Sequence, residues 1–251
     1  QPARAGGVLS GLLCELRNLL NLGTCAAQPT SPYNGLGQVT AIDRSGNGRV
    51  DTIYGGDLQG NLWKFDLSSA SAASWAVANG GNPLFTAELP SGERQPITGG
   101  MRVTAGPGTG VMVYFGTGRY LFGGPNGDNN VPQNPTVQSL YAVFDNNTRV
   151  ANGRSDLQVQ TITGSTDSGG NTTRSISRTR VVYNGAGSKR GWYVDLQVNT
   201  AAAGETPRYA AIGERFIATP RIQSGRVFFT TFTPSEDSCN PGGDNFVYGL
   251  D

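Results

Sequence analysis

Residues 43–51 carry oxygen atoms at the spacing of an EF-hand-type calcium loop, with ligand positions 1, 3, 5, 7 and 9 filled. The predicted Ca²⁺ ligands are four side chains and one main-chain carbonyl: Asp43, Ser45, Asn47, the Arg49 carbonyl and Asp51. Gly46 stands at position 6, where such a loop turns sharply and a side chain would resist the turn. The spacing therefore predicts a calcium site formed by residues 43–51.

The predicted loop is shorter than a full EF-hand loop. Position 12, which normally holds a glutamate, is Tyr54, so the loop must close on Asp51. The β-branched and aromatic run that follows indicates a loop between strands rather than helices. With two carboxylates and two flanking arginines, the expected affinity is weak, on the order of 10⁻⁴ M as in extracellular modules. The alternative is an ordinary Asp/Gly/Asn turn that binds no metal.

Composition removes most catalytic chemistries. The chain has 251 residues, a net charge of +1 and no histidine. Without histidine, Ser-His-Asp and Cys-His catalysis and the usual zinc sites are excluded, and we expect no enzyme. The near-zero charge predicts neither nucleic-acid nor membrane attraction.

A β-rich pattern recurs from residue 35 to residue 251, with short apolar runs separated by glycine-rich turns. Each repeat ends in an aromatic-containing strand and an aspartate, and the four repeats span residues 39–67, 96–145, 180–196 and 217–251. Repeated all-β units of this size are typical of propeller blades. The prediction is an all-β, modified or partial β-propeller of antiparallel sheet blades. Residues 146–179 are expected to form a polar loop that is an exposed insertion.

The closing aspartates of the four repeats are expected to be structural and to accept backbone N–H bonds in turns: Asp66, Asp145, Asp195 and Asp251. Trp63, Trp192 and Phe246 stand at equivalent places and are expected to pack between blades.

Residues 1–34 differ from the rest and are predicted to be a helical or linker segment. Leucines recur at helical spacing between residues 8 and 22, a stretch too short to span a bilayer. This short helix either covers an apolar face or ties the chain to something upstream. Cysteines occur at Cys14, Cys25 and Cys239, and the sequence leaves their disulfide pairing open.

The stretch from Asp43 to Leu67 resembles the C-terminal β-propeller of the PilY-type family of type IV pilus-tip adhesins and biogenesis factors. It combines the calcium loop with the run IYGGDLQGNLWKFDL. Further markers of the resemblance follow in order at residues 114–121, 138–141, 154–157, 191–196, 225–231 and 238–243. Together they cover most of residues 38–251.

The resemblance implies an exported module of a pilus-associated adhesin, located at the type IV pilus tip, the outer membrane or the cell surface. It implies minor pilins as partners, host or abiotic surfaces as attachment targets, and an adhesive domain upstream in the same protein. It also implies roles in pilus biogenesis and twitching motility, with calcium opposing retraction. Ser45 departs from the commoner Asp or Asn at its loop position, and no Arg-Gly-Asp motif is present.

Two other functions remain open from the sequence. A quinoprotein-like propeller dehydrogenase is suggested by the tryptophan-containing run at residues 57–66, although the adjacent cysteines of that class are missing. The other alternative function is an inert structural cap in which residues 43–51 bind no metal.

Overall fold

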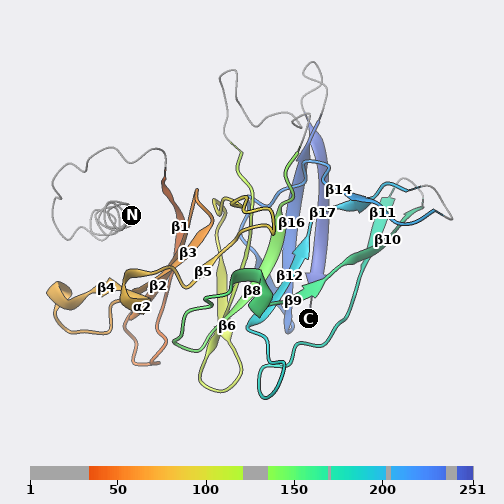
Figure 1. Ribbon diagram of the computed structural model, residues 1–251. Helices are drawn as coiled ribbons and strands as arrows, with labels where there is room; N and C mark the ends of the chain where they lie inside the picture. Colours follow the sequence, from red (N-terminus) through yellow and green to blue (C-terminus); the bar gives the residue numbers. More distant parts are fainter. Residues whose placement is uncertain (1–33, 121–134, 169–170, 202–204, 236–241, 251) are drawn as a thin grey trace.

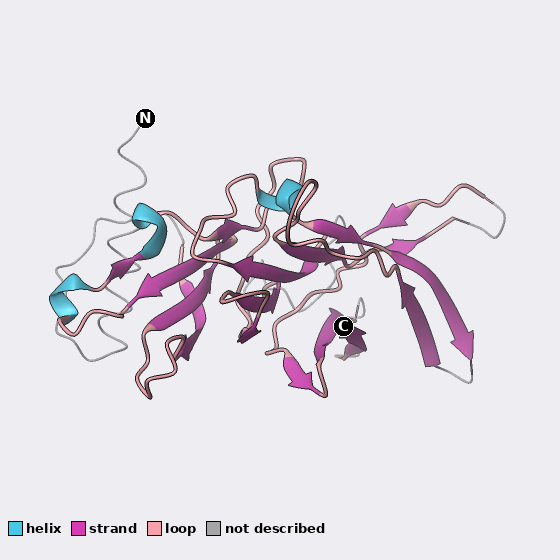
Figure 2. Cartoon of the chain, turned by 90° about the horizontal axis from the view of Figure 1, so that it is seen from below, coloured by secondary structure: helices cyan, strands magenta, loops and turns pink. Residues whose placement is uncertain are grey.

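A computed structural model describes residues 34–120, 135–168, 171–201, 205–235 and 242–250. Strands form most of the regular structure of these residues (Figure 2). The helical segments are single turns: η1 (Ala72–Ser74), α2 (Ala78–Gly81) and η2 (Gly153–Asp156). The expected helix at residues 8–22 and the three cysteines lie outside the described residues.

The first sheet contains the predicted calcium loop and is antiparallel throughout. Its strands are β1 (Leu36–Ile42), β2 (Thr52–Asp57), β3 (Asn61–Asp66) and β4 (Ala76–Val77), with β5 (Phe85–Thr86) also beside β3. Every residue of β2 is buried, and so are residues 62–65 of β3. The buried residues of these two strands include polar ones, Thr52, Asp57 and Lys64, and buried polar groups need hydrogen-bond or ionic partners.

The second sheet lies beside the first (Figure 1). Its strands, in spatial order, are β6 (Arg102–Ala105), β7 (Val111–Gly116), β8 (Ser139–Asp145), β12 (Gly191–Asp195) and β9 (Gln158–Gln160). All pairs are antiparallel except β12 with β9, which run parallel. All seven residues of the central strand β8 are buried.

The third sheet is smaller and is also antiparallel. It consists of β15 (Arg221–Gln223), β16 (Arg226–Pro234) and β17 (Gly243–Leu250). Two separate two-stranded ribbons complete the described strands: β10 (Ile162–Ser168) with β11 (Asn171–Ile176), and β13 (Val198–Asn199) with β14 (Tyr209–Ala210).

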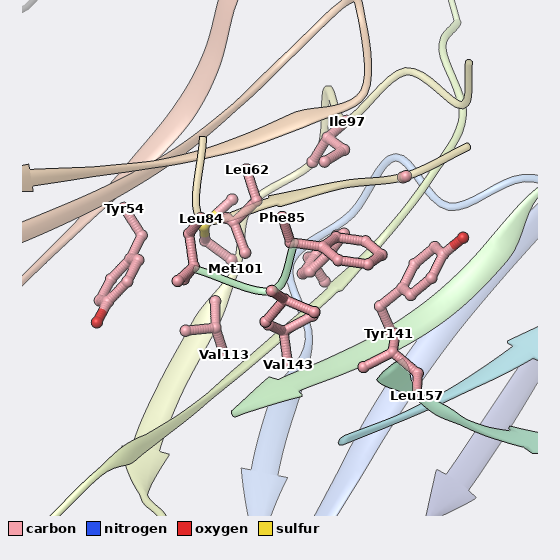
Figure 3. Close-up of a cluster of buried hydrophobic side chains, with 13 residues drawn as sticks. Tyr54, Leu62, Leu84, Phe85, Ile97, Met101, Val113, Tyr141, Val143 and Leu157 are labelled. Carbon is pink, nitrogen blue, oxygen red and sulfur yellow. The ribbon is translucent and has the colours of Figure 1, made fainter. Parts of the chain in front are cut away.

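Alternate side chains of β8 build two different cores. Tyr141 and Val143 join the cluster shared with the first sheet (Figure 3). In this cluster Phe115 stacks on Tyr141 with ring centroids 5.2 Å apart. Leu140 and Ala142 join a second cluster with Phe229 and Tyr248 of the third sheet. This period of two places apolar groups on both faces of one strand, so the second sheet is packed between the first and the third.

Two glycines allow neighbouring sheets to approach closely. A Cβ atom at Gly56 of β2 would lie 2.2 Å from Ile97 Cγ2, and one at Gly116 of β7 would lie 2.5 Å from the Phe216 ring. These distances are far below van der Waals contact, so neither position can hold a side chain without moving the adjoining segment.

The all-β fold of propeller-type antiparallel sheets is confirmed, but its division into repeats needs correction. The residues 180–196 do not form a blade of their own: β12 pairs with β8, Tyr193 opposite Tyr141, and completes the second sheet. Residues 146–179 are not a loop, because they contain β9, β10 and β11. The first error arises because pairing between strands far apart in the sequence, such as β8 and β12, leaves no local signal. The second has a different cause, because β10 and β11 form a local hairpin of mostly polar residues, a composition that is also typical of loops.

Candidate calcium site

The predicted calcium loop closes the hairpin between β1 and β2. Ile42 pairs with Thr52 at the last position of the ladder, and the Asp51 N–H donates to the Ile42 carbonyl at 3.1 Å. Gly46 and Gly48 adopt positive φ angles of 73° and 83° inside the loop, a conformation that suits glycine. The hairpin therefore fixes both ends of the loop while the glycines reverse the chain between them.

Asp43 organises the first half of the loop. Its Oδ1 accepts the Gly46 N–H at 2.7 Å, the Asn47 N–H at 3.1 Å and the Ser45 hydroxyl at 3.1 Å, and its Oδ2 accepts the Gly48 N–H at 2.6 Å. Desolvation acts to raise the pKa of Asp43, but these hydrogen bonds outweigh it and hold the pKa below 3.8. The carboxylate is therefore ionised at neutral pH.

Asp51 organises the other end of the loop and is buried. Its Oδ1 accepts the Arg44 N–H at 3.0 Å and the Thr52 hydroxyl at 2.9 Å, and its Oδ2 accepts the Ser45 N–H at 2.9 Å. Burial acts to raise the pKa of Asp51, but the hydrogen bonds from Arg44 and Ser45 keep it below 3.8. Ser45 thus bridges the two ionised carboxylates, with its hydroxyl on Asp43 and its N–H on Asp51.

Asn47 and Arg49 occupy the second, exposed half of the loop. Asn47 Oδ1 accepts the Arg49 N–H at 2.9 Å, which closes a local turn. The structure thus brings Asp43, Ser45 and Asp51 together, and joins Asn47 to the residue whose carbonyl was the fifth predicted ligand.

The donor set of this loop suits a calcium ion. Carboxylate, hydroxyl and amide oxygens are the hard ligands that Ca²⁺ takes in proteins. A carboxylate has about four lone-pair positions, and Oδ2 of Asp43 and Oδ2 of Asp51 each accept only one backbone N–H. Among the described residues no group of three or more His, Cys, Asp or Glu could hold a metal ion. Any ion in this loop would therefore depend on two carboxylates and neutral oxygens.

A second ionic cluster adjoins the loop, and the sequence did not predict it. Asp145, at the end of β8, has no exposed surface and accepts from Lys64 Nζ at 2.7 Å, Arg44 Nη1 at 3.0 Å and the Tyr54 hydroxyl at 2.5 Å. Burial acts to raise the pKa of Asp145, but the bonds from Lys64 and Tyr54 lower it overall. Lys64 was one residue in the sequence that could have indicated this cluster, since lysine occurs only there and at Lys189. It interrupts an apolar strand, where a charge needs a partner.

The expected roles of the closing aspartates hold in part. Asp66 accepts the Ser68 N–H at 2.9 Å and Asp145 accepts the Asn147 N–H at 2.7 Å, as predicted for turns. Asp195 instead accepts from the side chains of Ser139 and Arg154. Asp251 lies outside the described residues. Trp192 packs against Phe229 of the third sheet, with ring centroids 6.3 Å apart, as expected for packing between blades. Trp63 is buried in a cluster formed by the first sheet and its flanking residues.

The fold and the loop define a β-propeller module with a shortened calcium-type loop at one sheet end. The sequence profile of the PilY1 beta-propeller domain matches residues 26–174, and the chain belongs to this family. The PilY-type resemblance is therefore confirmed.

Known relatives agree with this membership. The chain is 44% identical over 225 residues to a type IV pilus biogenesis factor PilY1 homolog of Xylella fastidiosa, covering 87% of this chain and 14% of that protein. It is 33% identical over 253 residues to type IV pilus biogenesis factor PilY1 of Pseudomonas aeruginosa PAO1, covering 88% of this chain and 21% of that protein. The chain thus spans about a seventh to a fifth of these relatives.

A solved structure has the same fold. The crystal structure of the Pseudomonas aeruginosa PilY1 C-terminal domain superimposes with a TM-score of 0.69 at 30% identity, covering 89% of this chain and 48% of that one. Within the described residues, no helix has the length and apolar character needed to cross a membrane.

Proposed function

We propose that this module is a calcium-binding part of a type IV pilus biogenesis factor that acts at the pilus tip or cell surface. The observation that carries the proposal is the geometry of residues 43–51. In a PilY1-family propeller, this loop holds two ionised carboxylates that are both hydrogen-bonded to Ser45, and it closes the β1–β2 hairpin. The chemistry of the loop supports Ca²⁺ held by Asp43, Ser45, Asn47, the Arg49 carbonyl and Asp51.

Calcium would act on this module by binding the folded loop and not the unfolded chain. Binding of that kind stabilises the folded arrangement by mass action, and here it would hold the ends of β1 and β2 together. We propose that this ordering favours pilus extension over retraction, and that the module supports surface attachment and twitching motility. The proposed partners are minor pilins and an upstream adhesive domain of the same protein, with host or abiotic surfaces as targets.

A co-purification experiment with minor pilins tests this proposal. The wild-type protein should retain minor pilins more strongly in calcium than in a chelator, and Asp43→Asn combined with Asp51→Asn should remove the difference. Asp66→Asn is the matched control, because it changes an exposed turn aspartate of the same sheet outside the loop. Retention that is equal in calcium and chelator for the wild-type protein would contradict the regulatory role.

A second candidate, an inert structural cap, is favoured by one observation. The loop satisfies several of its own backbone donors, since Asp43 accepts the N–H groups of three successive residues. If residues 43–51 serve only as a turn, minor pilins should be retained equally by the wild-type protein and the double variant in both buffers.

A further inference from the structure

The side chain of Arg44, at the second position of the loop, leaves the loop and contacts the second sheet. We propose that Arg44 is a positioning residue that couples calcium binding by residues 43–51 to the attachment of the first sheet to the second. The inference rests on the proposed calcium function and assigns a route by which the ion would act on the propeller.

The main chain of Arg44 is hydrogen-bonded to Asp51, one of the proposed calcium ligands. Its N–H donates to Asp51 Oδ1 at 3.0 Å, and the next N–H, of Ser45, donates to Asp51 Oδ2 at 2.9 Å. Asp51 therefore fixes the backbone from which the arginine side chain starts. An ion that orders Asp51 also orders this segment.

The guanidinium of Arg44 binds a residue 101 positions away. Nη1 donates to Asp145 Oδ2 at 3.0 Å, and Nη2 donates to the Asp145 main-chain carbonyl at 3.3 Å. Only 15% of the Arg44 side chain is exposed and none of the Asp145 side chain is. This contact joins the loop of the first sheet to the end of β8, the central strand of the second.

Charge balance indicates that Arg44 is not needed to neutralise Asp145. Lys64 already places its ammonium 2.7 Å from Asp145 Oδ2, and the Tyr54 hydroxyl and the Asn147 N–H donate to the same carboxylate. Lys64 and Tyr54 come from the middle of strands β3 and β2. Arg44 is the one member of the cluster that lies in the loop, so it is the member that can transmit a change there.

Coupling of this kind is reciprocal. If calcium strengthens the contact between Arg44 and Asp145, that contact must strengthen calcium binding by the same factor. Simple electrostatics predicts the opposite sign, because removing a cation beside two carboxylates should raise affinity for Ca²⁺. The two explanations therefore predict opposite changes in calcium affinity when Arg44 is replaced: coupling predicts a decrease and simple electrostatics predicts an increase.

The test uses calcium titration calorimetry on the wild-type protein and three variants. Arg44→Met should weaken calcium binding roughly 5- to 20-fold, and Arg44→Lys, which can still reach Asp145, should recover part of the loss. Arg49→Met removes the same charge from the loop but keeps the main-chain carbonyl, and it should bind calcium as tightly as the wild-type protein or more tightly. Affinity that rises in both Met variants would overturn the coupling.

Hydrogen exchange of the loop amides without calcium provides a readout that does not need the ion. The Gly46, Asn47 and Gly48 amides should exchange faster in Arg44→Met than in the wild-type protein or Arg49→Met, because the loop loses its contact with β8. Unchanged exchange in Arg44→Met would also overturn the inference. If the wild-type protein binds no calcium, the calcium function fails, whereas faster exchange in Arg44→Met would still show that the contact with β8 orders the loop.

Discussion

Asp43 and Asp145 are both ionised aspartates at sheet ends, but they are stabilised in different ways. Asp43 is exposed and is held by backbone N–H groups of its own loop. Asp145 is completely buried and is held by side chains from another sheet. Water can replace the partners of an exposed carboxylate but not those of a buried one. The comparison indicates that water can take the place of the partners of Asp43, whereas the partners of Asp145 are a fixed part of the fold.

The largest effect should come from breaking the buried cluster. Asp145→Asn leaves Lys64, whose side chain is 9% exposed, without its counter-ion. Removing one partner of a buried ion pair costs about 3–5 kcal/mol, and urea unfolding measures the loss. Asp43→Asn should cost much less because water reaches that site. Equal losses for the two variants would contradict the distinction between the two regions.

Gly56→Ala should have the next largest effect. The added methyl group would lie 2.2 Å from Ile97 Cγ2, between the first sheet and the segment leading to the second. Overpacking a buried position costs about 1–3 kcal/mol. The free energy of unfolding, measured by urea titration, should fall accordingly, and wild-type stability in this variant would show that the sheets can move apart freely.

Gly48→Ala should have a smaller effect in the exposed loop. No atom lies within 4 Å of the position of an added Cβ, so only the positive φ of 83° opposes the change. The expected cost is about 1 kcal/mol, measured in the same urea titration. If Gly48→Ala lowered the free energy of unfolding more than Gly56→Ala does, the loop would be less tolerant of substitution than the contact between sheets, which would contradict the comparison.

The pH dependence of stability should also separate the two aspartates. A carboxyl whose pKa is lowered in the folded state stabilises it above the unfolded pKa of about 3.9, and this contribution is lost as the pH falls through the folded pKa. Both Asp43 and Asp145 have lowered pKa values. Stability should therefore fall with acidification, and Asp145→Asn should flatten this fall more than Asp43→Asn in unfolding measurements between about pH 5 and pH 2.

Much of the first sheet could be predicted from the sequence because its contacts are local. The loop at residues 43–51 and the strands around it follow one another along the chain, so spacing and turn residues specify them. Ser45 and Asp51 lie together because the β1–β2 hairpin pairs Ile42 with Thr52 and so brings the two ends of residues 43–51 side by side.

The contacts between sheets could not be predicted in the same way. Neither the pairing of Tyr193 with Tyr141 nor the bond from Arg44 to Asp145 has a sequence spacing that identifies it. From the sequence, the flanking arginine Arg44 is expected to weaken calcium binding. The sequence shows the charge of this side chain but not that the side chain extends to Asp145. Long-range pairing depends on the whole fold, and local patterns do not encode it.

The most direct test of the central claim is thermal unfolding of the purified protein in calcium and in chelator. With calcium at about 100 times its dissociation constant, binding to the folded state adds about 2.7 kcal/mol, which should raise Tm by roughly 5–10 °C for a chain of this size. Asp43→Ala combined with Asp51→Ala should abolish the rise, and Asp66→Asn should preserve it. Superimposable wild-type melting curves in calcium and chelator would show that residues 43–51 hold no ion.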